Sequence, residues 1–122
     1  MKLKNVLVAV EDMDLAVDFY RNLFGLQVVS NHSEIVILTE GLVLQDKKVW
    51  NQVLEQPVIS KSHAMMLYFE ERSIEAFVKK LDELYGDKIQ YLTPLMTLSW
   101  GQQLVRFYDL DGNLIEVRTP ME

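Results

Sequence analysis

Hydrophobic and polar residues alternate between Leu104 and Thr119, where the chain reads LVRFYDLDGNLIEVRT. Two short alternating runs joined by Asp111-Gly112 predict a β-hairpin, because this dipeptide accepts the positive φ angles of a tight two-residue turn. Alternation also assigns the side chains to two faces. The face expected to meet an apolar core carries Val105, Phe107, Ile115 and Val117. The opposite face carries Leu104, Arg106, Tyr108, Leu114, Glu116 and Arg118.

Glu116 is therefore expected in the middle of a strand, on the second face of this hairpin. If that face meets water, the carboxylate pairs with Arg106 across the two strands. If the face lines a cavity, Glu116 is a candidate catalytic or ligand-binding group. The pattern leaves both interpretations open.

Similar patterns predict the other elements. Strands are expected at 3–10, 26–30, 34–39, 42–46, 64–69, 89–92, 103–108 and 113–118. One helix has the stripe Ala16, Phe19, Tyr20, Leu23 and Phe24, with Asp12 or Asp14 as its cap and Gly25 as its end. A second helix has the stripe Ile74, Phe77, Val78, Leu81 and Tyr85, with Ser73 as its cap and Gly86 as its end.

The two helical stripes repeat at one spacing, since Ile74, Phe77 and Leu81 each follow their counterparts in the first stripe by 58 positions. A repeat of this kind indicates a duplicated unit. We therefore predict an α+β fold of two βαβββ modules. Module one covers about 1–46, a connector covers 47–62, and module two covers about 63–119.

Both tryptophans fall outside the predicted strands and helices. Trp50 lies in the connector, where residues 50–54 resemble a helical turn, and Trp100 lies in a second irregular segment, 93–101. Each tryptophan either plugs the edge of the core or forms the wall of a ligand pocket.

Composition limits the partners of the chain. A length of 122 residues suits one compact domain, and a net charge of −6 argues against nucleic acid, because no basic stripe is present. The absence of cysteine excludes disulfides and thiolate metal sites. No segment has the length of a membrane span, so we expect a cytoplasmic protein with no membrane contact. The acidic balance suits a cationic aromatic ligand.

The sequence resembles the vicinal oxygen chelate superfamily, the group of glyoxalases, bleomycin-resistance proteins and extradiol dioxygenases. The segments that carry the resemblance are VEDMDLAVDFYRNLFGLQVV (10–29), LYFE (67–70) and WGQQLVRFYDLDGNLIEV (100–117). The resemblance covers nearly the whole chain as one domain. It implies paired βαβββ modules whose mixed sheets form a cup, a homodimer, and in catalytic members a divalent metal held by the first and last strands of each module.

At the family's four metal positions this chain has Asn5, Leu44 or Gln45, Ala64 or Met66, and Glu116. Amides bind divalent ions weakly, alanine offers no donor, and methionine suits softer ions. We therefore expect no resident cofactor, since the ligand set for a divalent metal is incomplete.

His63 is the other weak metal candidate beside Glu116. The spacing of 58 places His63 opposite Asn5, whereas the alternation of LYFE turns it away from the face of Glu116. We expect His63 at the start of a strand, partly exposed, and not as a ligand.

Three functions follow from this resemblance and these residues. The first is metal-independent binding of a small organic molecule, in which the candidate ligand-binding residues are Asn5, Gln45, Trp50, Met66, Tyr68, Trp100, Arg106 and Tyr108. The alternative is a metal-dependent lyase or isomerase, like lactoylglutathione lyase, or a dioxygenase-like enzyme, with Glu116 moving a proton. The third is a partner protein whose cup is filled by its own side chains.

Overall fold

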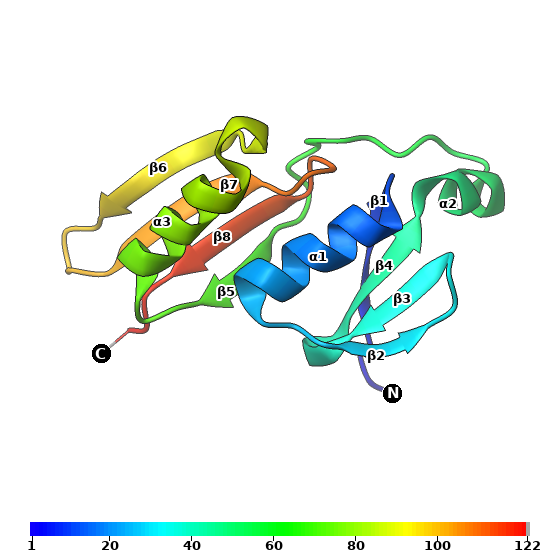
Figure 1. Ribbon diagram of the computed structural model, residues 1–122, viewed down its shortest axis with the longest axis horizontal. Helices are drawn as coiled ribbons and strands as arrows, with labels where there is room; N and C mark the ends of the chain where they lie inside the picture. Colours follow the sequence, from blue (N-terminus) through cyan, green and yellow to red (C-terminus); the bar gives the residue numbers. More distant parts are fainter. Residues whose placement is uncertain (122) are drawn as a thin grey trace. The chain divides into compact units, whose positions relative to one another are not determined.

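The structure is a computed structural model that describes residues 1–121, and it contains two compact units (Figure 1). The first unit, Met1–Ile59, contains β1 (Val6–Val10), α1 (Met13–Phe24), β2 (Val28–Asn31), β3 (Ile35–Leu38), a short 3₁₀ helix (Thr39–Gly41), β4 (Leu42–Asp46) and α2 (Lys47–Leu54). The second unit begins at Ser60 and contains β5 (Leu67–Glu70), α3 (Ile74–Tyr85), a 3₁₀ turn (Gly86–Lys88), β6 (Tyr91–Thr97), β7 (Gln103–Tyr108) and β8 (Leu114–Arg118).

The two units have the same topology. The strand order is β1-β4-β3-β2 in the first sheet and β5-β8-β7-β6 in the second. In each sheet the first strand pairs with the last one in parallel, and the remaining neighbours are antiparallel. The predicted α+β fold of two βαβββ modules with mixed sheets is therefore confirmed.

Helix α1 begins and ends where capping chemistry predicts, whereas Ser73 stands at the N-cap of α3 without a side-chain capping hydrogen bond. Asp12 is the N-cap of α1, because its Oδ1 accepts a hydrogen bond from the backbone N of Leu15 at 3.1 Å. Gly25 ends the helix with a φ of 67°, a left-handed conformation that glycine adopts without strain. The buried residues of α1 and α3 include the pairs that the 58-residue repeat predicts: Ala16 and Ile74, Phe19 and Phe77, Leu23 and Leu81.

Two segments differ from the sequence prediction. β6 runs from Tyr91 to Thr97, although the sequence predicted a strand that ends at residue 92. Pro94 made the second half of this strand hard to predict from sequence. The proline is tolerated because β6 is an edge strand, in which some backbone positions need no N–H donor. In the connector, α2 begins already at Lys47, because the carboxylate of Asp46 accepts from the backbone N of Lys48 at 2.8 Å.

The turn between β7 and β8 is longer than the predicted two-residue turn. Gly112 has a φ of 82°, but Asp111 does not have a positive φ. Asp109 holds the loop instead, since its Oδ1 accepts from the backbone N of Asp111 and of Asn113, each at 2.9 Å. Such a carboxylate-centred turn is a common use of aspartate. It pairs Tyr108 with Leu114, one residue away from the pairing of Tyr108 with Ile115 that a two-residue turn at Asp111-Gly112 would give.

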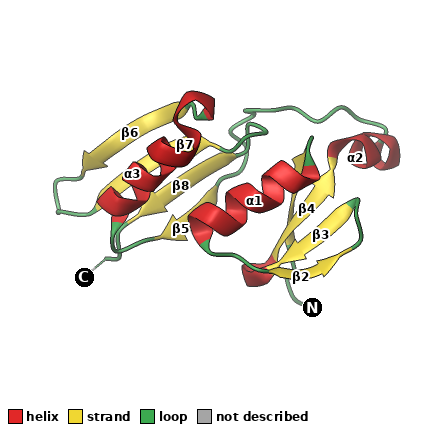
Figure 2. Ribbon diagram, viewed as in Figure 1, coloured by secondary structure: helices red, strands yellow, loops and turns green. Residues whose placement is uncertain are grey.

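None of the helices among residues 1–121 is both long enough and apolar enough to span a membrane. Each unit has its own four-stranded sheet, accompanied by helices (Figure 2).

Candidate functional site

The two faces of the second sheet differ in chemistry, as alternation predicted. One face packs against α3 (Figure 2). The rings of Phe77 and Phe107 lie 6.1 Å apart on that face. The opposite face, here called the Glu116 face, carries Tyr68 of β5, Thr93 of β6, Arg106 and Tyr108 of β7, and Glu116 and Arg118 of β8. Tyr68, Glu116, Arg106 and Thr93 form one row across the four strands.

Glu116 is held at both carboxylate oxygens by arginine. The Nε of Arg106 donates to Oε1 at 2.6 Å, and the Nε of Arg118 donates to Oε2 at 3.0 Å. The Glu116 residue is 2% exposed, whereas the side chains of Arg106 and Arg118 are 30% and 23% exposed. Pairing with Arg106 was one of the two interpretations of the sequence. Pairing with Arg118 was not predicted.

Two neutral acceptors hold the arginines in place. Nη1 of Arg106 donates to Oγ1 of Thr93 at 3.3 Å, and Nη1 of Arg118 donates to Oε1 of Gln102 at 3.3 Å. Thr93 reaches this face because the pairing of β6 with β7 shifts between Tyr91 and Thr93, so a β-bulge redirects its side chain. These bonds fix the orientation of both guanidinium groups around one carboxylate.

Two tyrosines extend the Glu116 face. Tyr68 is 53% exposed and its backbone pairs with that of Glu116, so its ring offers an open aromatic surface. Tyr108 is 4% exposed; its hydroxyl is hydrogen-bonded to Nε2 of His63, and Nζ of Lys61 lies 5.3 Å from its ring centre. His63 has a φ of 61° and precedes β5, so strand alternation does not determine its direction.

In the first unit, the two amides at the family's metal positions are not brought together. Asn5 lies just before β1, whereas Gln45 is paired with Ala9 near the far end of that strand. Four residues of strand at about 3.3 Å each separate them by about 13 Å. Each amide also bonds to backbone: Asn5 donates to the O of Gly41 at 3.3 Å, and Gln45 to the O of Glu34 at 3.1 Å.

The alternative position in the first unit, Leu44, is fully buried. In the second unit, Ala64 and Met66 precede β5 and offer no oxygen or nitrogen side-chain donor. Within residues 1–121 there is no group of three or more His, Cys, Asp or Glu residues arranged to hold a metal ion. The residues present therefore do not fit the divalent metal that the fold family implies.

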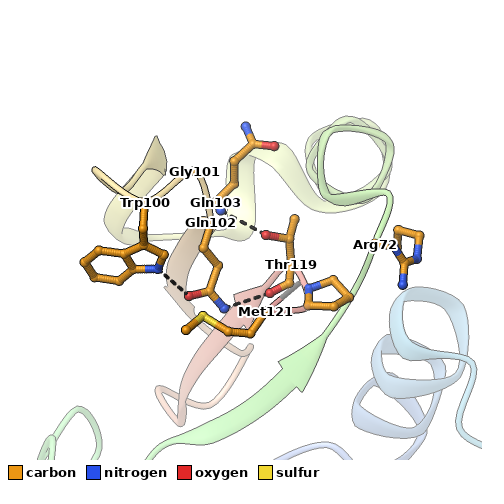
Figure 3. Close-up of a pocket in the computed structure, with 8 residues that line it drawn as sticks. Arg72, Trp100, Gly101, Gln102, Gln103, Thr119 and Met121 are labelled. Atoms are coloured by element: carbon orange, nitrogen blue, oxygen red, sulfur yellow. Dashed lines mark hydrogen bonds between the residues drawn. The ribbon is translucent and has the colours of Figure 1, made fainter.

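A pocket of about 530 Å³ lies at one end of the second sheet (Figure 3). It is lined by Arg72, Trp100, Gly101, Gln102, Gln103, Thr119, Pro120 and Met121. Gln102 links this pocket to the Glu116 face, because its Oε1 accepts from Nε1 of Trp100 at 3.1 Å as well as from Arg118. Its Nε2 donates to the backbone O of Thr119 at 2.8 Å.

The two tryptophans, each expected either to plug the core or to line a pocket, differ in their surroundings. Trp100 is 61% exposed and lines the pocket, so it does not plug the core. Trp50 lies in α2 of the first unit and is half-buried. The two indoles belong to different compact units.

Sequence reasoning missed three members of the site: Arg118, Gln102 and Thr93. A signal for Arg118 was present, because alternation placed it on the same face as Glu116, two residues away. Gln102 precedes β7 and Thr93 depends on a bulge, so neither position follows from periodicity.

Comparison with known proteins agrees with this architecture. The sequence profile of the Glyoxalase-like domain matches residues 3–122. A structure of a protein of unknown function from Agrobacterium tumefaciens is 25% identical, with a TM-score of 0.80 and coverage of 99% of this chain and 95% of the other. Lactoylglutathione lyase from Agrobacterium tumefaciens is 20% identical, with a TM-score of 0.68 and coverage of 97% and 92%.

A third similar structure is a glyoxalase/bleomycin resistance protein/dioxygenase family enzyme from Burkholderia phytofirmans, 13% identical, with a TM-score of 0.75 and coverage of 97% and 98%. No curated protein sequence matches the chain. Since the profile spans nearly every residue, the chain belongs to the Glyoxalase-like domain family.

Proposed function

We propose that this chain binds a small organic molecule on the Glu116 face and that binding needs no divalent metal. One observation carries the proposal: Arg106 and Arg118 occupy both oxygens of the carboxylate that corresponds to the family's last metal ligand. A metal ion at Glu116 would have to displace at least one of these charge-assisted bonds. Among residues 1–121 no group of three or more His, Cys, Asp or Glu residues is arranged to hold the ion in return.

The groups around the ion pair suit ligand binding. Ligand sites combine apolar or aromatic surface with a few fixed polar groups. Tyr68 supplies exposed aromatic surface beside Glu116, and Trp100 supplies more at the adjoining pocket. The arginines, fixed by Thr93 and Gln102, are polar groups whose orientation is already set in the free protein.

The similar structures support the fold of this chain. The chemistry of the site has to be argued from this chain's own residues. The similar structures described above include a lactoylglutathione lyase at 20% identity. At that identity the likeness concerns the fold alone, because one fold supports many unrelated activities. Acid–base catalysis by Glu116 is therefore not part of the proposal. We also propose that the chain acts in the cytoplasm and that it forms a homodimer. Light scattering of the purified protein tests the homodimer.

Calorimetric titration of the protein with Ni²⁺, Zn²⁺ and Mn²⁺ tests the metal-independent part. We expect no stoichiometric binding, and the same result for Glu116→Gln and for a surface control, Glu11→Gln. A thermal-shift screen of small organic molecules, run with and without EDTA, tests binding itself. We expect stabilising molecules whose effect is unchanged by EDTA.

One tightly bound ion per chain, lost in Glu116→Gln and kept in Glu11→Gln, would overturn the proposal. That result would favour the metal-dependent lyase or isomerase. If no molecule in a broad screen stabilises the protein, the binding function fails as well, and a cup filled by its own side chains becomes the better account.

A further inference from the structure

The charge on the Glu116 face identifies a ligand class. Two guanidinium groups surround one carboxylate, so the cluster of Arg106, Arg118 and Glu116 carries one positive charge in excess. Resting on the proposed binding function, we infer that this cluster is an oxyanion site, which takes the carboxylate or phosphate group of a small organic molecule. The local charge is thus opposite to that of the cationic ligand suggested by the net charge of the whole chain.

The arginines have donors left for such a group. The contacts with Glu116, Thr93 and Gln102 use the Nε and Nη1 atoms of each arginine. Both Nη2 groups remain without a partner in these contacts. Among residues 1–121 no buried side-chain nitrogen or oxygen lacks a hydrogen-bond partner. The unused N–H groups are therefore accessible to solvent and to a ligand.

Glu116 acts in this site as a positioning residue. Two arginines side by side repel each other, and a buried carboxylate between them removes most of that repulsion. Because Glu116 accepts a hydrogen bond from both Nε atoms, each planar guanidinium is held in one orientation. The Nη2 group left on each arginine carries two N–H donors, and charged donors of this kind bind carboxylate and phosphate oxygens.

Other charged groups near the cluster do not cancel its excess charge. Glu70 pairs with Arg118 along β5 and β8, but it is exposed and forms no ion pair with that arginine. An exposed carboxylate is screened by water and salt, so it competes weakly with a bound oxyanion. Lys61, next to Tyr108 at the other end of the face, adds a further positive charge.

The neighbouring ring of Tyr68 indicates the rest of the ligand. The backbone of Tyr68 pairs with that of Glu116, and the tyrosine is 53% exposed on the same face as the arginines. An aromatic or other flat organic group attached to the oxyanion would stack on this ring. Benzoate and phenyl phosphate are therefore suitable probes, and benzamide is the neutral control of matching shape.

The test is calorimetric titration of the full chain with these three probes, and with benzylamine as a cation of similar size. We expect benzoate and phenyl phosphate to bind. Benzamide and benzylamine should bind at least about tenfold more weakly, because a hydrogen bond to a charged group contributes more binding free energy than one to a neutral group, by an amount that corresponds to about this factor. A stronger response to one of the two anions assigns the site to carboxylates or to phosphate esters. Raising the salt concentration should weaken both.

Variants locate the site. Arg106→Gln and Arg118→Gln should each weaken anion binding by about tenfold or more, and Arg106→Lys should restore part of it. The exposed Arg21 on α1 is the matched control, and Arg21→Gln should leave binding unchanged. Glu116→Gln should weaken anion binding, because both arginines lose the carboxylate that fixes their orientation. Circular dichroism tests whether each variant is folded. If Arg118→Gln alone unfolds, the double variant Glu116→Gln/Arg118→Gln replaces it, because the double variant keeps the net charge of the cluster unchanged.

Two results would overturn the inference. One is equal affinity for benzoate and benzamide. The other is anion binding that Arg106→Gln and Arg118→Gln leave intact. If neutral or cationic molecules bind, and the binding depends on Tyr68, the oxyanion site is wrong while the proposed binding function survives. If none of the probes and no molecule of the broad screen binds, both proposals fail.

Discussion

Arg106 and Glu116 lie directly opposite each other on β7 and β8, and the guanidinium Nε donates to the carboxylate at 2.6 Å. Arg118 binds the second oxygen from the same strand as Glu116. The carboxylate is thus the centre of a small network that joins the two strands of the hairpin. Its removal should change the stability of the protein as well as ligand binding.

Glu116→Gln should lower the free energy of unfolding by about 2 kcal/mol, because it leaves two arginines without their shared counter-ion. The loss stays below that of a fully buried pair, since both arginine side chains are partly exposed. Urea unfolding measures it. The control is Glu11→Gln, which removes an exposed contact with Lys47 at 3.6 Å and should change stability by less than about 0.5 kcal/mol. Equal losses in the two variants would contradict a structural role for the network.

Gly112→Ala should destabilise the second unit by about 1–3 kcal/mol. A Cβ at this position would lie 1.9 Å from Oγ of Ser60, and the φ of 82° disfavours any residue with a side chain. Thermal unfolding of the variant measures the loss. Ser60→Gly in the same background should recover only the steric part. Gly86→Ala is the matched control, because a Cβ there meets nothing within 4 Å and the backbone is right-handed helical; this variant should be neutral or slightly stabilised.

Tyr91 should make the protein less stable in alkaline solution. Burial, followed by the hydrogen bond to Asp82 and the charge of that carboxylate, raises the pKa of Tyr91 well above its ordinary value of 10.0. The folded state therefore keeps a proton that the unfolded state loses above pH 10.0, so this contribution to stability is complete below pH 10.0 and declines as the pH rises further.

Urea unfolding between about pH 8 and pH 11 measures this decline, which Tyr91→Phe should make shallower. Tyr68→Phe is the control, because that hydroxyl bonds no other described residue and the variant should decline as the wild type does. A Tyr91→Phe variant with an unchanged alkaline decline would show that the contact at 2.6 Å with Asp82 does not contribute.

Leu81→Ala should cost about 2–5 kcal/mol, because the leucine is fully buried where α3 meets the second sheet and its removal leaves a cavity. Leu84→Ala, three residues further along the same helix, should cost less than about 0.5 kcal/mol, since Leu84 is 51% exposed. Chemical denaturation of the two variants compares them directly. Similar losses would mean that α3 packs through a different face.

Much of the fold follows from periodicity, because both the helical spacing of apolar residues and the alternation of strands are strong in this chain. The bounds of β4 and β7 are those predicted, and the duplicated helical stripe places the buried faces of α1 and α3 correctly. Ends of elements were less predictable. Pro94 concealed half of β6, and the cap at Asp46 lengthened α2 at its start.

The site was only partly predictable, because it depends on side-chain partners across strands. Alternation placed Arg106, Glu116 and Arg118 on one face, which is correct, but a carboxylate with one arginine opposite gave no reason to expect two. The separation of Asn5 from Gln45 follows from the parallel register of β1 and β4, which the sequence does not reveal. Thr93 reached the site through a bulge that no local pattern indicates.

The parallel pairing of first and last strands also has a consequence for synthesis on the ribosome. In the first unit, the partner of β1 is complete by Asp46, so that sheet can close early in translation. In the second unit, β5 waits for residues 114–118, and until they emerge its main-chain donors and acceptors on that side are unpaired. A nascent chain halted before residue 114 would therefore carry an open strand edge, the kind of surface that invites aggregation and recruits chaperones.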